Sequence, residues 1–170
     1  MPTIAMKDRK SKWIVAEVVP NKGECPYAAR RIARNLRQLG YKMIYWKSGQ
    51  EPSILALRNQ VRMEVAQDIE IVNEETPVGD SKSNADAESG VKQCEGMFRT
   101  VKGALEGRYG KKLWEECETV PWLVRHATLA MSRYRVGTDG KTAYERLKMR
   151  KFNRTVCEFG ECGWQALIHI

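Results

Sequence analysis

The stretch Lys47-Ser48-Gly49-Gln50-Glu51-Pro52 closes an apolar segment and opens a helix, and the rest of the fold can be worked out from it. Residues 41–46 are apolar at almost every position, which is typical of a central strand covered on both faces. Pro52 suits the first turn of a helix, where its missing N–H donor is not needed. Ligands of open α/β sheets bind at the carboxyl ends of strands, so a site would be built at Ser48 and Gly49.

A hairpin and a helix are expected before this stretch. Residues 3–6 and 13–19 read as strands joined by a polar turn, in which Asp8 is a turn residue. Apolar residues recur at helical spacing from Pro26 until Gly40 ends the helix. The arginines of the opposite helix face are Arg30, Arg31, Arg34 and Arg37. They fit either a solvated face or contact with phosphates.

Helices and a short strand are expected after the quoted stretch, and this alternation predicts an α/β sheet. Residues 52–65 form a helix with Ile54, Leu57, Val61 and Val65 inward, residues 69–72 a short strand, and residues 74–82 a polar loop. Ser83 is expected to cap a long helix together with Asp86. The predicted buried stripe of that helix is Ala87, Val91, Cys94, Phe98, Val101 and Leu105. Residues 121–134 predict another helix, and residues 141–154 a basic segment leading into an irregular tail.

The length and charge of the chain favour one domain with an anionic partner. A chain of 170 residues with 42% hydrophobic content can bury the core of one ordinary domain. The net charge is +8, and it is unevenly distributed. Residues 1–50 hold 11 basic against 3 acidic groups, residues 51–90 hold 3 against 9, and residues 91–170 hold 15 against 9. Cationic flanks around an acidic middle suit a polyanion such as nucleic acid.

The cysteines and the hydropathy pattern indicate an intracellular protein, nuclear or cytoplasmic. Five cysteines without disulfide-scaffold spacing are best explained as reduced thiols. Cys157, Cys162 and His169 fit no zinc-finger spacing and lack a fourth ligand. No apolar signal core begins the chain and no run approaches the length of a membrane span, so we expect neither secretion nor a membrane partner.

The ordered set of elements and motifs resembles the integrase catalytic core of LTR retrotransposons and retroviruses, within the ribonuclease H-like superfamily. The motifs are Lys-Ser-x-Gln-Glu-Pro at residues 47–52, the helix entry at residues 83–88, and Gly-Lys-Thr-x-Tyr-Glu at residues 140–145. The resemblance covers residues 3–160 and implies a mixed sheet flanked by helices, lacking the first, central strand. It implies a truncated core domain at residues 1–135 and a basic C-terminal extension at residues 136–170.

Members of this family cut and join DNA with Asp, Asp and Glu carboxylates that hold two divalent ions, Mg²⁺ or Mn²⁺. By this resemblance Glu88 matches the third carboxylate, and Gly49 stands where the second Asp should be. The first Asp would sit on a strand before Thr3, which we expect this chain to lack. Glu88 would then hold metal only weakly, and the resemblance implies a catalytically inactive protein. Glu88 also fits a surface glutamate stabilised by the positive end of its helix.

The resemblance implies that DNA is the partner. Lys92 lies one turn after Glu88, where family members contact DNA, and Arg99, Lys47 and Lys82 are the other candidate contacts. Two alternatives remain open at this point. One is a protein–protein interaction or assembly module derived from an integrase, with a possible homodimer. The other is an active polynucleotidyl transferase completed in trans by another polypeptide.

Overall fold

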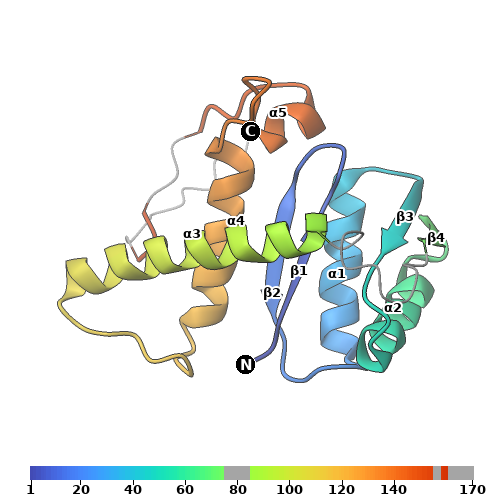
Figure 1. Ribbon diagram of the computed structural model, residues 1–170, viewed down its shortest axis with the longest axis horizontal. Helices are drawn as coiled ribbons and strands as arrows, with labels where there is room; N and C mark the ends of the chain where they lie inside the picture. The colour runs from blue at the N-terminus through green and yellow to red at the C-terminus, as the bar shows by residue number, and fades with distance from the viewer. Residues whose placement is uncertain (75–84, 155–157, 161–170) are drawn as a thin grey trace, which may run out of the picture.

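A computed structural model describes residues 1–74, 85–154 and 158–160, and within them the expected order of strands and helices is present. The chain is a mixed α/β protein (Figure 1). The elements are β1 (Thr3–Lys7), β2 (Ile14–Val18), α1 (Pro26–Leu39), β3 (Met43–Lys47), α2 (Pro52–Val65), β4 (Glu70–Glu74), α3 (Ala85–Tyr109), α4 (Val120–Tyr134) and α5 (Ala143–Lys148). The predictions on Lys82, Ser83, Cys157, Cys162 and His169 fall outside the described residues.

The strands form two separate pairs. β1 and β2 are an antiparallel hairpin in which Thr3 faces Val18, and β3 and β4 are parallel, with Met43 facing Glu70. The prediction of Asp8 as a turn residue is confirmed, because its carboxylate accepts hydrogen bonds from the backbone N–H groups of Lys10 (3.2 Å) and Ser11 (2.9 Å). β1 and β3 therefore each have one hydrogen-bonded neighbour among the described strands.

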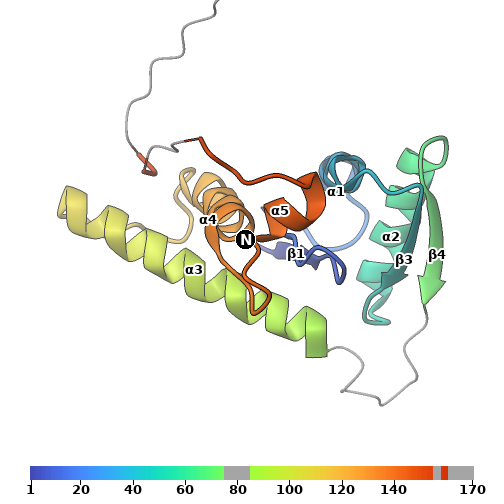
Figure 2. The same cartoon turned by 90° about the horizontal axis from the view of Figure 1, so that it is seen from above.

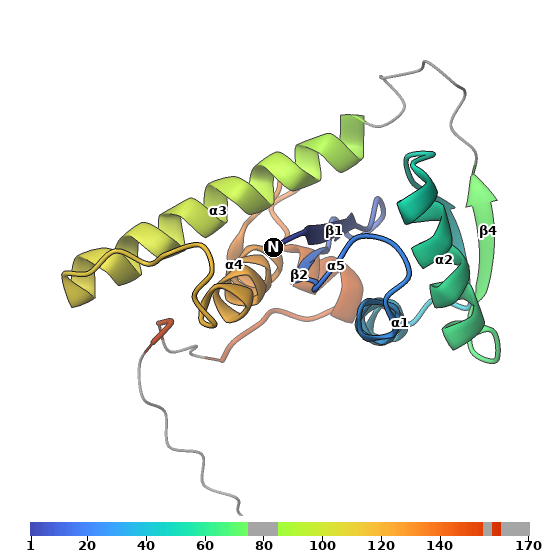
Figure 3. The same cartoon turned by 90° about the horizontal axis from the view of Figure 1, so that it is seen from below.

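Two apolar cores hold these elements together. One lies between α1, α2 and the β3–β4 pair, with Ile32 and Val61 fully buried. The other joins the hairpin to α3 and α4, which lie on the side of the hairpin away from β3 and β4 (Figures 2 and 3). Long α3 crosses both α4 and the hairpin, so its N-terminal turns come close to the hairpin turn (Figure 1).

Local sequence signals explain the helix ends. α1 begins at Pro26 and is followed by Gly40 at φ 75°, a left-handed conformation that glycine adopts without a Cβ clash. α5 lies within the basic segment of residues 141–154, for which no helix was predicted. A capping box stabilises this short helix, because Glu145 N–H donates to Thr142 Oγ1 (3.1 Å) while Thr142 N–H donates to Glu145 Oε2 (2.7 Å).

Three predictions of burial are corrected by the structure. β3 is not covered on both faces, since Tyr45 is 67% exposed while Trp46 packs against the core. The helix residues Ala87 and Val91 are exposed, although Cys94 and Leu105 of the same predicted stripe are buried. Ile54 is exposed as well. Periodicity along one segment shows which of its sides is apolar, but it does not reveal how far other elements cover that side.

A buried carboxylate connects β2 to two helices. Glu17 is only 4% exposed, and its Oε1 accepts hydrogen bonds from Arg31 (2.9 Å) and Asn35 (3.2 Å) of α1. Arg125 Nε of α4 lies 3.8 Å from the other oxygen. Arg31 is thus neither a solvated residue nor a phosphate contact, and Arg37 pairs with Asp68 (2.7 Å).

Candidate nucleic-acid interface

Gly49 follows the end of β3, as the sequence indicated. A Cβ added at Gly49 would lie 3.9 Å from Ile54 Cδ1, which is an ordinary van der Waals contact. Two side-chain atoms near the same strand ends, Ser48 Oγ and Asn73 Oδ1, are buried without a hydrogen-bond partner among the described residues. Position 49 therefore has room for a Cβ, and Gly49 supplies no side-chain ligand there.

Glu88 lies in the first turn of α3 and is exposed. The neighbouring carboxylate of Asp86 accepts a hydrogen bond from Arg9 Nε (2.9 Å), so the hairpin turn is tied to the start of the helix. This bond is the main cause that holds the pKa of Asp86 below its ordinary value. Glu88 has no such partner in the part of the chain that the structure describes.

The described residues around Gly49 and Glu88 do not supply the ligands that a pair of divalent ions needs. Across residues 1–74, 85–154 and 158–160, no three His, Cys, Asp or Glu side chains are placed to share one ion. Glu88 stands without a second carboxylate at Gly49, and Asp86 is engaged by Arg9. Mg²⁺ needs several hard oxygen ligands in near-octahedral geometry, so one exposed glutamate cannot seat a two-ion centre.

A ridge of charged residues continues along α3 from Glu88. Lys92, Glu95 and Arg99 follow it by steps of four, three and four residues, which places them on one side of the helix. Lys92 and Arg99 are exposed and form no ion pair with any carboxylate that the structure describes. Lys47 differs, because its Nζ lies 3.5 Å from Glu74 Oε1. The structure thus leaves two of the four predicted contacts unpaired on α3.

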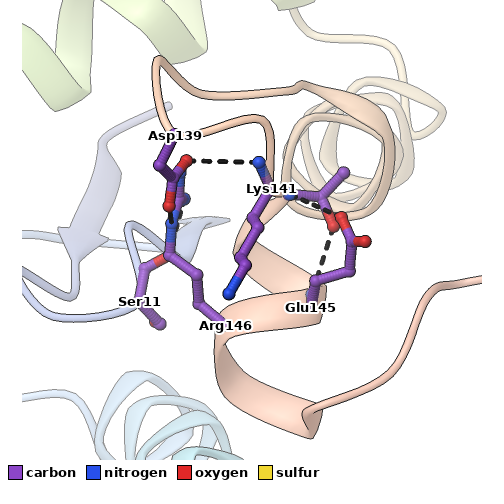
Figure 4. Close-up of polar contacts among 6 residues, drawn as sticks. Ser11, Asp139, Lys141, Glu145 and Arg146 are labelled. Atoms are coloured by element: carbon purple, nitrogen blue, oxygen red, sulfur yellow. Dashed lines mark hydrogen bonds and ion pairs between the residues drawn. The ribbon is translucent and has the colours of Figure 1, made fainter.

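A second polar centre, which sequence reasoning did not single out, joins the hairpin turn to residues 139–146 (Figure 4). Arg146 Nε donates to Asp139 Oδ2 (2.9 Å), a second guanidinium nitrogen donates to Oδ1, and a third donates to the carbonyl oxygen of Ser11 (3.2 Å). The bond from Arg146 is the main cause that holds the pKa of Asp139 far below its ordinary value. The Thr-x-x-Glu spacing was a local signal of ordered structure there, but nothing in it pointed to Ser11.

Comparison with known proteins supports the fold and nothing finer. No protein-family model matches this sequence, and no curated protein matches it. Among solved structures, the catalytic core domain of BIV integrase matches with a TM-score of 0.53 and 18% sequence identity, over 86% of this chain and 85% of that chain. The chain therefore has the ribonuclease H-like fold of an integrase core, and that prediction is confirmed. Within the described residues, no helix combines the length and the apolar character needed to cross a membrane.

Proposed function

We propose that this protein is a nucleic-acid-binding relative of retrotransposon integrase cores, connected to DNA integration by descent, that does not catalyse strand transfer by itself. The observation that carries this proposal is the α3 ridge of Glu88, Lys92 and Arg99 on an integrase-core fold, in a chain that has a glycine at position 49. Residues 1–135 form the degenerate core, and residues 136–170 are its basic extension.

Unpaired cations on α3 support DNA as the partner. The backbone of DNA is a dense line of negative charge, and lysine or arginine side chains that reach it release condensed counterions. A side chain that already holds a carboxylate would have to give up that partner first. Lys92 and Arg99 form no such pair with the described carboxylates, so they are available at lower cost than Lys47.

Removing both cations of the ridge tests this interface. We expect the variant Lys92→Ala/Arg99→Ala to bind duplex DNA about tenfold or more weakly at low salt, since each lost charge-assisted contact is worth on the order of 1.5 kcal/mol. Fluorescence anisotropy with a labelled duplex measures the change. The matched control is Lys111→Ala/Lys112→Ala, which removes the same charge from exposed residues outside the ridge. Equal losses in the two variants would show attraction by net charge alone and would count against the α3 interface.

An end-joining assay with Mg²⁺ or Mn²⁺ tests the expected lack of catalysis. We expect no joining of donor ends to target DNA by the unaltered chain or by Gly49→Asp, because Asp at position 49 and Glu88 supply two of the three carboxylates that the two-ion mechanism uses. A Cβ at position 49 makes only an ordinary van der Waals contact, so Gly49→Ala serves as the control, and circular dichroism of both variants checks that they fold. Joining by the unaltered chain would disprove the proposal. Joining by Gly49→Asp alone would show that the glycine is the only defect.

We infer that the strand carrying the first Asp of the family belongs between β1 and β3. Each of these strands has hydrogen-bonded neighbours on one side only among the described residues. β1 is the hairpin strand on the side of the β3–β4 pair (Figures 1 and 3). Exposed Met43 and Tyr45 on β3 are the kind of apolar surface that such a strand would border. If this protein is instead an active transferase completed in trans, the other polypeptide would have to supply this strand.

A second candidate function is assembly, and two exposed tryptophans favour it. Trp114 is 80% exposed and Trp122 is 63% exposed, although tryptophan is a residue that association commonly buries. Trp114 precedes α4, and Trp122 lies in its first turn. A mass that rises with protein concentration, together with weak DNA binding, would favour this function over the first.

A further inference from the structure

A hollow of about 630 Å³ opens between the hairpin turn, the end of α1 and residues 139–151. Lys10 and Ser11 line it from the hairpin turn, and Tyr41 lines it from the segment after α1. It is separate from the candidate interface, since neither Gly49 nor the ridge on α3 contributes to its lining. The polar centre of Figure 4 forms one of its walls.

The carboxylates around this hollow already have donors. Asp139 is held by two nitrogens of Arg146, and the same guanidinium reaches Ser11, so the hairpin turn and residues 139–146 are fixed to each other. Glu145 is engaged in the capping box by the N–H of Thr142 (2.7 Å). Both carboxylates therefore already accept hydrogen bonds from the protein itself.

The cations around the hollow have no such partners. Lys10, Lys141, Arg150 and Lys151 line it and are exposed, and no carboxylate in the described part of the chain lies within ion-pair distance of them. Together with Arg146, five basic side chains line the hollow against two acidic ones, Asp139 and Glu145. The unpaired charge therefore favours an anion with several oxygen acceptors, and a phosphate group has that chemistry.

One wall of the hollow is aromatic and apolar. The hydroxyl of Tyr41 donates to Asp8 Oδ2 (2.8 Å), which orients the ring, and Lys10 Nζ lies 5.9 Å from the ring centroid. Leu39, Leu147 and Met149 add apolar surface beside it. A flat base or a sugar can pack against such a wall while its phosphate faces the lysines.

We propose that this hollow binds the phosphate of a nucleotide, either a free nucleotide or one unit of a nucleic-acid strand. Four unpaired cations next to an aromatic ring match the two chemical parts of that ligand. The site requires no contact with α3, and it stands whether or not the ridge binds DNA.

Calorimetric titration of the full chain with dAMP, and with a short single-stranded oligonucleotide, tests this site. The variant is Lys141→Ala/Arg150→Ala, and the control of equal charge is Lys111→Ala/Lys112→Ala. We expect the first variant to weaken binding about tenfold or more and the control to leave it within about twofold. The side chains of Lys141 and Arg150 form no hydrogen bond or ion pair with the described residues, so circular dichroism should show unchanged folding.

The two probes distinguish the source of the phosphate. Binding of dAMP that is lost in Lys141→Ala/Arg150→Ala supports a free nucleotide as ligand. If only the oligonucleotide binds, and Lys141→Ala/Arg150→Ala weakens that binding, the ligand is a nucleic-acid strand. The weakening should also be seen when Lys141→Ala/Arg150→Ala is added to Lys92→Ala/Arg99→Ala, because the hollow is separate from α3. The proposal is overturned if neither probe binds, or if the variant and its control weaken binding equally.

Discussion

Replacing Glu17 by alanine is expected to lower the free energy of unfolding by about 3 kcal/mol, because removal of one partner leaves buried charge without compensation. Arg31, whose side chain is largely buried, would lose the oxygen that it bonds at 2.9 Å. Arg125 would lose its partner at 3.8 Å, although it is more exposed and can turn to water. For a chain of this size the melting temperature should fall by roughly 6–12 °C, which thermal denaturation followed by circular dichroism measures.

Two further variants show whether charge is the cause. Glu70→Ala removes an exposed strand glutamate and should change stability by less than about 0.5 kcal/mol. Glu17→Met/Arg31→Met should recover part of the loss, since an apolar pair of similar volume often replaces a buried ion pair without a large penalty. A melting temperature for Glu17→Ala within about 2 °C of that of the unaltered chain would mean that both arginines find water instead.

The affinity for DNA should fall steeply with salt. If the four predicted contacts, Lys47, Lys82, Lys92 and Arg99, each neutralise one phosphate, the slope of log K against log salt is about −3.6. That slope corresponds to a loss of roughly a hundredfold in affinity between about 50 mM and about 200 mM salt. Anisotropy titrations at several salt concentrations measure it.

The same titrations assign the slope to residues. Lys92→Ala/Arg99→Ala should reduce its magnitude by about 2, whereas Lys111→Ala/Lys112→Ala should leave it nearly unchanged. A slope that stays the same without Lys92 and Arg99 would place the DNA elsewhere on the protein. Affinity that changes by less than about threefold over the same range would exclude a phosphate-driven interface altogether.

The order of elements and most helix ends were predictable because their signals are local. Proline at Pro26 and Pro52 suits a first helical turn, and the left-handed position after α1 suits glycine at Gly40. The same reasoning did not predict α5, although Thr142 and Glu145 in the basic segment of residues 141–154 have the spacing of a capping box. Gly49 and Glu88 were also placed correctly on their elements, at the end of β3 and in the first turn of α3.

Contacts between distant residues were beyond prediction from one sequence. Ser132 of α4 both accepts from Ile14 N–H and donates to Ile14 C=O (3.1 Å each), across a separation of 118 residues. Arg146 reaches Ser11 across 135 residues. Periodicity reports which side of one segment is apolar, but the surface that covers it belongs to another segment, so exposed Val91 and Tyr45 could not be foreseen.

The sequence alone determined the class of fold, the order of its strands and helices, and the absence of a carboxylate side chain at position 49, since these depend on neighbouring residues and residue identity. Only the tertiary structure decided which basic side chains remain free of carboxylate partners and can bind an anion. It pairs Arg31 with Glu17, Arg9 with Asp86 and Arg146 with Asp139, and it leaves Lys92 and Lys141 without carboxylate partners in the described chain. Coulomb attraction falls off with distance in space, and distance along the chain does not determine it.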